Sequence, residues 1–285
     1  MPEGDTIFRA ARALGRALGG RPITAFRSTY PKLTRHNEDA PLAGQFVVKV
    51  EPRGKWLLIH FSSGATLATH MLMNGSWHIY RPGQRWQQPP INMRILIETN
   101  DYVAVGFRVP VAEMHTSESL RRDRRIPNPE TDVLSNAFDM HETMQRLSAH
   151  ADEAIGDVLL RQHVLAGVGN VFKSEVCFVT GVHPYCKVAW LSKDEMRTVI
   201  AAAQKLIASN VLEDSGNTIV TFGGRTRRTT HEARPGASLW VYGRAGEPCR
   251  RCGEIIRRRI QGPDARVTFW CPNCQRMPNG ADIDG

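Results

Sequence analysis

Two pairs of cysteines near the end of the chain have the spacing of a metal-binding site. Cys249 and Cys252 form one C-x-x-C pair, and Cys271 and Cys274 form the other. Four thiolates in two such pairs are typical of a tetrahedral structural zinc site. The interval between the pairs suits a β-hairpin and is rich in arginine. A metal-bound hairpin covered in guanidinium groups is typical of a finger that binds nucleic acid.

The N-terminus offers a second kind of chemistry. Removal of Met1 would leave Pro2 as the terminal residue, with a secondary amine that is nucleophilic when unprotonated. Its attack on an aldehyde-level carbon gives an iminium that stays cationic and favours elimination. Glu3 lies beside it and could act as the general acid or base. Because many chains begin with Met-Pro by chance, a frayed terminus is the alternative.

Three further features could bind phosphate. The run Gly167–Gly169 permits a tight turn, and Asn170 then opens a predicted helix whose amide groups can bind an anion. Lys55 follows a glycine at a predicted turn, and Arg266 lies where a hairpin would hold its guanidinium rigidly. Each has an ordinary alternative, a helical hairpin turn for the glycines and a solvated surface charge for the two cations.

Two histidines and one cysteine are predicted to pack in the interior. His70 falls in a predicted strand and His163 in a predicted amphipathic helix, and Cys177 lies in an apolar run. The 10 histidines form no ligand-spaced cluster with carboxylates. We therefore predict one structural Zn²⁺ ion and no catalytic metal.

Charge favours a polyanionic partner. The 285 residues include 37 Lys and Arg against 28 Asp and Glu, which gives a net charge of +9. This excess favours nucleic acid over membrane. There is no signal-peptide pattern, and no stretch approaches the roughly 20 apolar residues that cross a bilayer. We expect a cytoplasmic protein in a reducing compartment, where paired cysteines bind metal rather than form disulfides.

The elements that must position these residues fall into two regions. Asp5 is predicted to cap a first helix that ends at Gly19-Gly20. Short strands then indicate a sandwich or barrel. They are predicted at 45–50, 55–61, 66–71, 76–80, 91–98 and 102–105, with turns at 52–54, 73–75 and 100–101. From about Asp132 the pattern becomes helical. These helices are predicted at 141–149, 154–165, 170–180 and 192–209, before a loop over 211–237.

Together these motifs resemble the Fpg/Nei DNA glycosylases, the family of formamidopyrimidine-DNA glycosylase and endonuclease VIII. The resemblance covers nearly the whole chain. It is carried by the start at 1–4, the lysine-bearing turn at 53–55, a helix-two-turn-helix motif over 159–170, and the finger with its approach at 241–249. The start is most similar to the endonuclease VIII branch, whose substrates are mostly oxidised pyrimidines.

The resemblance implies a bifunctional DNA glycosylase and abasic-site lyase. Pro2 would attack the sugar carbon of a damaged nucleotide as the base leaves, and Glu3 would transfer a proton at the sugar ring. The iminium would then permit strand cleavage by β,δ-elimination. Lys55 and Arg266 would support these steps by contacting phosphate.

The resemblance also implies how DNA is held. Asn170 would grip a phosphate beside the lesion together with Arg266. Chemistry on a base in a duplex requires extrusion of the nucleotide, and the apolar wedge of Leu72, Met73 and Asn74 would fill the vacated space. The implied partner is double-stranded DNA with an oxidised base or an abasic site, bound by a monomeric enzyme of the bacterial nucleoid.

The implied fold is α+β. An N-terminal β-sandwich with an N-terminal helix would occupy residues 1–126. A helical helix-two-turn-helix domain would span 127–240, and the four-cysteine finger with its β-hairpin would span 241–276, before a tail over 277–285. DNA would bind in a basic cleft between the first two domains.

Two segments depart from the family. Asp5-Thr6 stands where the family often has Pro-Glu, so a carboxylate at the sixth position is missing. Asp5 could substitute for it or only cap the first helix. The run 221–236 differs from both branches and is expected to border the lesion pocket.

Two other functions remain open on the residues alone. A non-catalytic DNA-binding protein would explain the finger and the charge, but would leave Pro2, Glu3 and Lys55 as accidents. An N-terminal-proline tautomerase would explain Pro2 but not the finger. Retention of Met1 would block the amine and favour binding alone.

Overall fold

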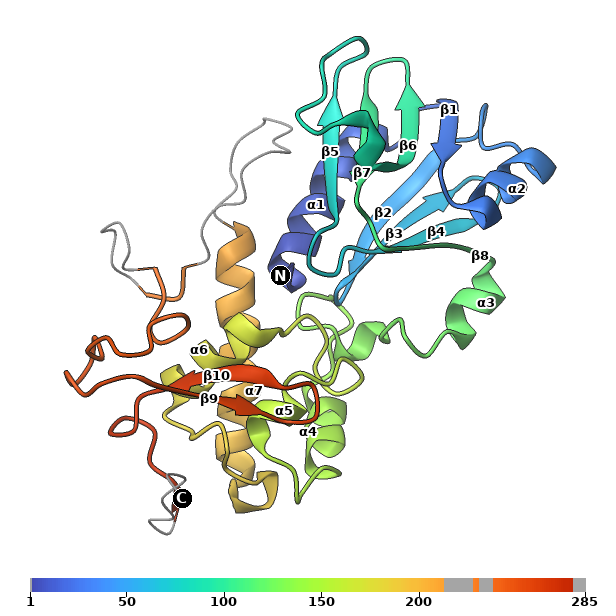
Figure 1. The fold of residues 1–285 in the computed structure, drawn as a ribbon. Helices are drawn as coiled ribbons and strands as arrows, with labels where there is room; N and C mark the ends of the chain where they lie inside the picture. Colours follow the sequence, from blue (N-terminus) through green and yellow to red (C-terminus); the bar gives the residue numbers. More distant parts are fainter. Residues whose placement is uncertain (1, 213–227, 231–237, 279–285) are drawn as a thin grey trace. The chain divides into compact units, whose positions relative to one another are not determined.

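The computed structural model describes residues 2–212, 228–230 and 238–278 (Figure 1). These residues divide into two compact units between Ile126 and Pro127. Most of the loop predicted over 211–237, including nearly all of the divergent run 221–236, lies outside the described residues, as does most of the tail. Across the described part of the chain, every helix is too short or too polar to span a membrane.

The first unit is a β-sandwich preceded by helix α1 (Gly4–Leu18). One antiparallel sheet has the order β1-β6-β7-β5, formed by β1 (Ile23–Ser28), β6 (Met93–Thr99), β7 (Val103–Phe107) and β5 (Ser76–Tyr80). The other has the order β2-β3-β4-β8, formed by β2 (Val47–Arg53), β3 (Trp56–Phe61), β4 (Thr66–His70) and β8 (Val111–His115). Shorter elements are α2 (Pro31–Asp39), η1 (Pro90–Asn92) and α3 (Ser117–Arg122). The sandwich is confirmed over the barrel, because the strands form separate sheets.

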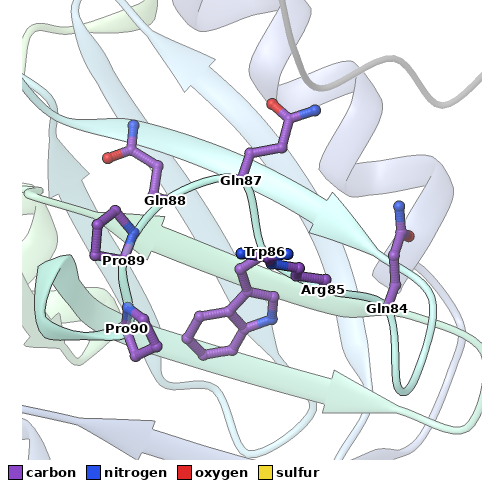
Figure 2. A pocket seen from close by; sticks show the side chains of 7 residues that line it. All are labelled: Gln84, Arg85, Trp86, Gln87, Gln88, Pro89 and Pro90. Carbon is purple, nitrogen blue, oxygen red and sulfur yellow. The ribbon is translucent and has the colours of Figure 1, made fainter.

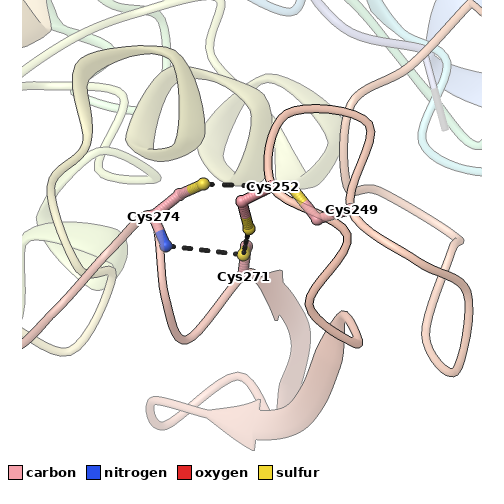
Figure 3. Close-up of side chains that lie close together, drawn as sticks. All are labelled: Cys249, Cys252, Cys271 and Cys274. Carbon is pink, nitrogen blue, oxygen red and sulfur yellow. Dashed lines mark hydrogen bonds between the residues drawn. The ribbon is translucent and has the colours of Figure 1, made fainter.

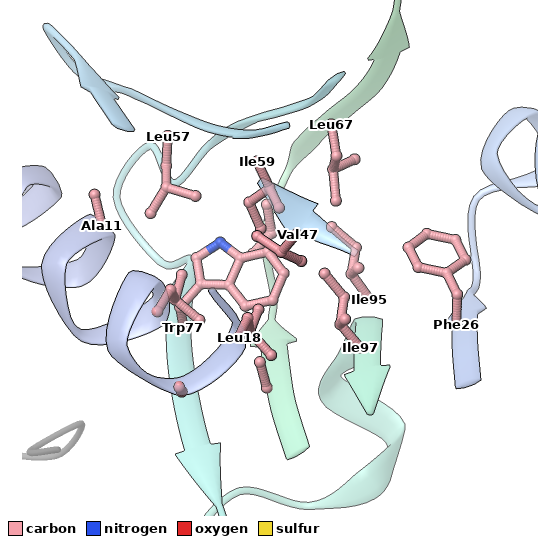
Figure 4. Packing of buried hydrophobic residues seen from close by; sticks show 14 of the residues in the cluster. Ala11, Leu18, Phe26, Val47, Leu57, Ile59, Leu67, Trp77, Ile95 and Ile97 are labelled. Carbon is pink, nitrogen blue, oxygen red and sulfur yellow. The ribbon is translucent and has the colours of Figure 1, made fainter. Parts of the chain in front are cut away.

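A shared core explains why these elements form. The buried residues of α1 recur at helical spacing, so one face of the helix joins the core (Figure 4). Leu57 and Leu67 enter the core from one sheet, and Trp77 and Ile97 enter it from the other. The indole of Trp77 also donates to Thr69 Oγ1 at 3.3 Å, which links the two sheets by a polar contact.

Two of the three predicted turns join paired strands. Strands β2 and β3 form a hairpin in which Arg53 pairs with Trp56, so its two turn residues are Gly54 and Lys55. This turn lies one residue later than predicted. Gly54 has φ +58°, a left-handed conformation that favours glycine. Strands β6 and β7 form the hairpin expected at 100–101.

The expected hairpin at 73–75 is wrong. Strands β4 and β5 belong to different sheets, so the segment between them crosses the sandwich instead of joining neighbours. The glycine is still required there. The amide of Gly75 donates a hydrogen bond to the carbonyl oxygen of Met71. A Cβ on residue 75 would lie only 2.7 Å from that oxygen, which is too close for any other residue. The Asn-Gly pair therefore marks a tight corner rather than a β-hairpin turn.

The predicted capping role of Asp5 is also wrong. The helix starts at Gly4, and its N-cap residue is Glu3, whose carbonyl accepts from the amides of Thr6 and Ile7. Asp5 instead lies inside the first turn and is fully buried, with Arg9 Nη2 at 3.4 Å from its carboxylate. The chain enters the helix earlier than the Asp signal suggested.

The second unit is helical and carries the finger hairpin. Its helices are η2 (Pro129–Thr131), α4 (Met140–Ser148), α5 (Ile155–Val158), α6 (Asn170–Thr180), η3 (Val188–Trp190) and α7 (Lys193–Leu212). The hairpin consists of β9 (Arg257–Gln261) and β10 (Arg266–Trp270), paired antiparallel with Arg266 opposite Gln261. Helix α6 lies between α7 and β10, so it connects the helical core to the finger.

The helix predicted over 154–165 is much shorter. Helix α5 ends at Val158, and single turns follow, with the Val164 amide bonding the Arg161 carbonyl at 2.9 Å. The side chain of Gln162 accepts from the Gly167 amide at 3.1 Å and donates to the Val168 carbonyl at 3.0 Å. These bonds stabilise the turns in place of a helix. His163 therefore lies in a turn, not in a helix as predicted.

Candidate functional site

The four predicted zinc ligands lie together at the base of the finger (Figure 3). The Sγ atoms of Cys249 and Cys274 are 3.9 Å apart, and those of Cys252 and Cys271 are 3.5 Å apart. A tetrahedral site with Zn–S bonds of about 2.3 Å places its sulfur atoms about 3.8 Å apart. The cysteine cluster therefore fits a Zn²⁺ ion without rearrangement.

The surroundings of the thiols differ in whether they favour a thiolate. Hydrogen bonds from Asn273 and from the backbone at Glu254 lower the pKa of Cys252 to about 6. The amide of Arg251 donates to Cys249 Sγ at 3.4 Å. Burial raises the pKa of Cys274, so a cation is needed to hold that group as a thiolate. These four cysteines hold one structural zinc ion.

The two remaining cysteines are interior residues, which confirms the prediction for Cys177. Burial raises the pKa of Cys177 to about 12 and that of Cys186 to about 11. Both are almost completely buried in the helical core. Neither belongs to the cysteine cluster at the finger.

Asn170 and Arg266 come together in the second unit. Asn170 is the first residue of α6, and its Nδ2 donates to the carbonyl of Val267, the residue after Arg266, at 2.8 Å. Gly169 is the N-cap and supplies no side-chain cap, and the first turn carries no acidic residue. The N-terminus of α6, with its positive dipole, therefore lies beside the strand that carries Arg266.

A buried lysine ties the same helix to the hairpin. Lys173 is fully buried one turn after Asn170, and its Nζ donates to Thr268 Oγ1 at 2.7 Å. Thr268 donates in turn to Gln261 Oε1 at 2.6 Å. These bonds fix β10, which carries Arg266, against the helix that carries Asn170.

Glu175 is a structural residue that sequence reasoning missed. Its fully buried carboxylate accepts from the amides of Trp240, Val241 and Tyr242 at 2.8, 2.9 and 2.8 Å, and from the hydroxyl of Thr229. It therefore anchors the approach to the finger on α6. Its partners lie more than 50 residues away, so no local signal could have found it.

Lys55 lies at the tip of the β2–β3 hairpin in the first unit and is largely buried. Burial and, to a smaller extent, the charge of Lys55 lower the pKa of His70 to about 4. Neutral His70 accepts from the amide of Leu72 at 3.1 Å through Nδ1. It also meets Trp56 edge to face, with ring centroids 5.2 Å apart. The hairpin tip and the start of the predicted wedge are therefore neighbours.

The predicted wedge is exposed. Leu72 is 44% exposed and Met73 is 61% exposed, and Asn74 follows them on the surface. Leu72 has φ +44°, an unusual conformation for a residue with a side chain. Exposed apolar residues on a tight corner suit contact with another molecule.

Pro2 and Glu3 stand at the head of α1. Pro2 is half-buried, whereas Glu3 is fully buried. Helix α1 packs along β2 and β3, so the helix that begins beside Pro2 neighbours the hairpin that carries Lys55. The first unit thus holds a secondary amine, a buried carboxylate and a buried ammonium group.

Two further features lie elsewhere in the first unit. A shallow pocket within the β5–β6 loop is lined by residues 84–90 (Figure 2), and it contains none of the predicted site residues. Glu113, His115 and Asp123 form a cluster in which the ligand atoms all lie within 4.8 Å of one another. The prediction that histidines form no such cluster with carboxylates is therefore wrong. The i, i+2 spacing of Glu113 and His115 on one strand face was the available signal.

Three family sequence models match the chain in order. Residues 1–110 match the formamidopyrimidine-DNA glycosylase N-terminal domain. Residues 129–222 match the formamidopyrimidine-DNA glycosylase H2TH domain. Residues 246–276 match the zinc finger found in FPG and IleRS.

Curated relatives are similar over nearly their whole length. The chain is 39% identical to the probable endonuclease 8 2 of Streptomyces coelicolor, covering 98% of this chain and 95% of the relative. It is 36% identical to the DNA-(apurinic or apyrimidinic site) lyase Nei2 of Mycolicibacterium smegmatis, covering 96% and 99%. It is 31% identical to endonuclease 8 of Escherichia coli, covering 96% and 100%.

A solved structure shares the fold. Lactococcus lactis formamidopyrimidine-DNA glycosylase, non-covalently bound to DNA containing an abasic site, matches with a TM-score of 0.77 at 19% identity. The match covers 96% of this chain and 99% of that one. At this identity the likeness shows the shared fold.

Proposed function

Because the chain belongs to the Fpg/Nei family of DNA glycosylases, we propose that it is a bifunctional DNA glycosylase and abasic-site lyase of base excision repair. The proposal includes removal of oxidised bases, chiefly pyrimidines, because its relatives at 31–39% identity are named endonuclease 8. Double-stranded DNA is the partner, and the setting is the bacterial cytoplasm at the nucleoid. The observation that carries the proposal is Pro2-Glu3 at the head of α1 in a chain with all three family domains.

The reaction begins at the N-terminus. Pro2 nitrogen forms a bond to the sugar carbon as the bond from that carbon to the damaged base breaks. Glu3 transfers a proton at the sugar ring, which opens it to an iminium on Pro2. Full burial of Glu3 supports this role, because a carboxylate shielded from water can exchange its proton with the bound sugar rather than with solvent.

Strand cleavage follows from the charge on the iminium. The cationic nitrogen withdraws electrons and acidifies the neighbouring sugar proton. Loss of that proton expels one phosphate, and a second elimination expels the other, which leaves a one-nucleotide gap. Lys55 contacts phosphate and supports departure of the base, and its low exposure beside neutral His70 supports a fixed position for its ammonium group.

Asn170 and Arg266 hold the DNA backbone beside the lesion. The Nδ2 of Asn170 uses one proton for Val267, so its second proton is available to a phosphate oxygen. Arg266 supplies a bidentate cation at the same place. Leu72, Met73 and Asn74 enter the base stack, a role supported by the exposure of Leu72 and Met73.

Base release by the purified protein tests this function. Duplexes carrying one oxidised pyrimidine, or one oxidised purine, would be incubated with the wild type and with Glu3→Gln. We expect release of the oxidised pyrimidine by the wild type and a loss of about 100-fold or more in the variant. Tight binding to an abasic duplex without release of any oxidised base would favour the non-catalytic DNA-binding function.

A further inference from the structure

A three-residue cluster on the first unit has the composition of a metal site. Glu113 and His115 project from one face of β8, and Asp123 follows α3. His115 Nε2 lies 3.5 Å from Glu113 Oε2 and 3.9 Å from Asp123 Oδ2. Two carboxylates and an imidazole are ligands that bind Zn²⁺ in proteins.

The imidazole is poised as a ligand. The side chain of His115 is 9% exposed, and its Nε2 has no hydrogen-bond partner in the described part of the chain. Its Nδ1 lies 3.2 Å from Ser119 Oγ, which fixes the orientation of the ring. A buried ring nitrogen that faces two carboxylates and bonds neither lacks the partner that such a group requires. A cation between the three groups would supply it.

A guanidinium already neutralises part of the cluster. Arg125 donates from Nη1 to Glu113 Oε1 at 3.0 Å and from Nε to Asp123 Oδ1 at 2.9 Å. Its Nη2 donates to Glu113 Oε2 and Asp123 Oδ2, the two oxygens that face His115. These bonds lower the pKa of Asp123. The side chain of Arg125 is 56% exposed, so water can take over the hydrogen bonds of its guanidinium when a metal displaces it. Two carboxylates against one guanidinium leave one negative charge beside the imidazole of His115.

We propose that Glu113, His115 and Asp123 form a second Zn²⁺ site, separate from the finger, in which the metal competes with the guanidinium of Arg125. A tetrahedral ion with bonds of about 2.0–2.1 Å needs ligand atoms about 3.3 Å apart. The observed 3.5 and 3.9 Å require the imidazole to approach each carboxylate by only tenths of an ångström, and all three ligand atoms lie within 4.8 Å of one another. Ser119 orients the imidazole, as outer partners do in metal sites.

Occupancy would affect the boundary of the first unit. The carbonyl of Arg125 accepts from the indole of Trp56 at 3.0 Å, and its guanidinium lies 5.7 Å from the centre of that ring. Trp56 follows Lys55 in the chain and contacts His70. Metal binding that releases the guanidinium would therefore alter the surroundings of the hairpin that carries Lys55.

Metal stoichiometry tests the proposal on the full chain with its finger loaded. Protein would be dialysed against Zn²⁺ and its metal content measured, for the wild type, His115→Ala, Asp123→Asn and Arg125→Met. His141→Ala, which removes an exposed histidine on the second unit, is the control. We expect one additional ion per chain in the wild type and the control, and none in the first two variants.

The arginine variant tests the competition. We expect Arg125→Met to bind the additional ion about 5- to 10-fold more tightly, because an exposed ion pair competes weakly. Co²⁺ would report the ligand type, since the cluster lacks the thiolate absorption of the finger. Circular dichroism and retained finger zinc would show that His115→Ala is folded. The proposal would be overturned if the wild type bound no additional ion. It would also be overturned if the additional ion were still bound by both His115→Ala and Asp123→Asn.

Discussion

At the scale of single residues, buried charged groups determine how the second unit is held together. The carboxylate of Glu175 accepts from three consecutive backbone amides of the approach to the finger. Lys173 bonds the hairpin from the same helix. Both residues lie within two turns of Asn170, so the proposed phosphate contact depends on groups that never touch DNA.

Removal of the Glu175 carboxylate should destabilise the protein strongly. Glu175→Ala would leave one buried and two partly buried amides without acceptors, so we expect the free energy of unfolding to fall by about 3 kcal/mol or more. Urea denaturation would measure it. Glu142→Ala, which breaks a surface pair with Arg146, is the matched control and should cost no more than about 0.5 kcal/mol. Equal losses in the two variants would contradict this role.

Protonation of His70 should destabilise the first unit in acid. Its pKa is about 4 in the folded protein and about 6.5 when unfolded, so the unfolded chain binds more protons between these values. Stability is therefore unaffected above pH 7 and falls as the pH drops from 6.5 toward 4, by about 2 kcal/mol after allowance for solvent screening.

The measurement is the urea midpoint as a function of pH in the wild type and in His70→Asn. The amide oxygen of asparagine can still accept from Leu72, whereas it does not titrate. Other histidines with lowered pKa, such as His78 and His183, contribute to both proteins and cancel in the difference. Identical pH profiles for the two proteins would contradict the assignment.

Arg266 should contribute one phosphate contact. We expect Arg266→Ala to weaken binding to abasic-site DNA by about tenfold and to reduce the slope of log affinity against log salt by about one. Fluorescence anisotropy at several salt concentrations would measure both. Arg122→Ala, which removes an exposed arginine paired with Glu118 on α3, is the control. An unchanged slope in the Arg266 variant would count against phosphate binding.

At the scale of elements, the finger is a hairpin that depends on its metal. It has one small cluster of buried apolar residues, which includes two of the zinc ligands. We therefore expect Cys271→Ser to release zinc and to weaken DNA binding. Metal analysis and anisotropy would measure the two effects. Cys186→Ala, which changes a buried cysteine outside the cluster, is the control and should keep its zinc. Normal zinc content and normal DNA affinity in Cys271→Ser would refute the role of the finger.

The elements themselves were predictable where their signals were local. The Pro-Arg-Gly segment predicted the β2–β3 hairpin to within one residue, because a glycine turn between alternating residues determines its own geometry. The corner at Gly75 was misread, because a local turn signal does not say whether the next strand joins the same sheet. The 154–165 helix was overextended because buried Ile155, Val158 and Leu165 have helical spacing, although Leu165 follows a series of turns.

The candidate site was likewise predictable only where its residues follow a local sequence pattern. The cysteines and Asn170 follow fixed spacings that their chemistry requires, and the predicted metal ligands do lie together. Glu175 and the cluster of His115 with Asp123 were missed, because their partners meet only through the tertiary fold. The assignment of Pro2, Glu3 and Lys55 to catalysis remains a prediction.

At the scale of the whole molecule, the proposed chemistry and the proposed DNA grip lie on different units. Pro2, Glu3 and Lys55 belong to the first unit, whereas Asn170 and Arg266 belong to the second. A DNA substrate must therefore contact both units for the reaction to occur. Variants that weaken the grip should reduce the apparent affinity, and variants at Pro2 should strongly reduce covalent chemistry while binding persists.

Borohydride trapping tests the central claim most directly. Untagged protein shown by mass spectrometry to lack Met1 would be mixed with an abasic-site duplex and reduced, with Pro2→Gly and Arg122→Ala in parallel. We predict a covalent protein–DNA complex in the wild type and in Arg122→Ala, with the adduct on the nitrogen of Pro2. The yield of trapped complex should fall strongly in Pro2→Gly. No adduct from protein with a free terminal proline, or an adduct mapped to a lysine, would contradict the account.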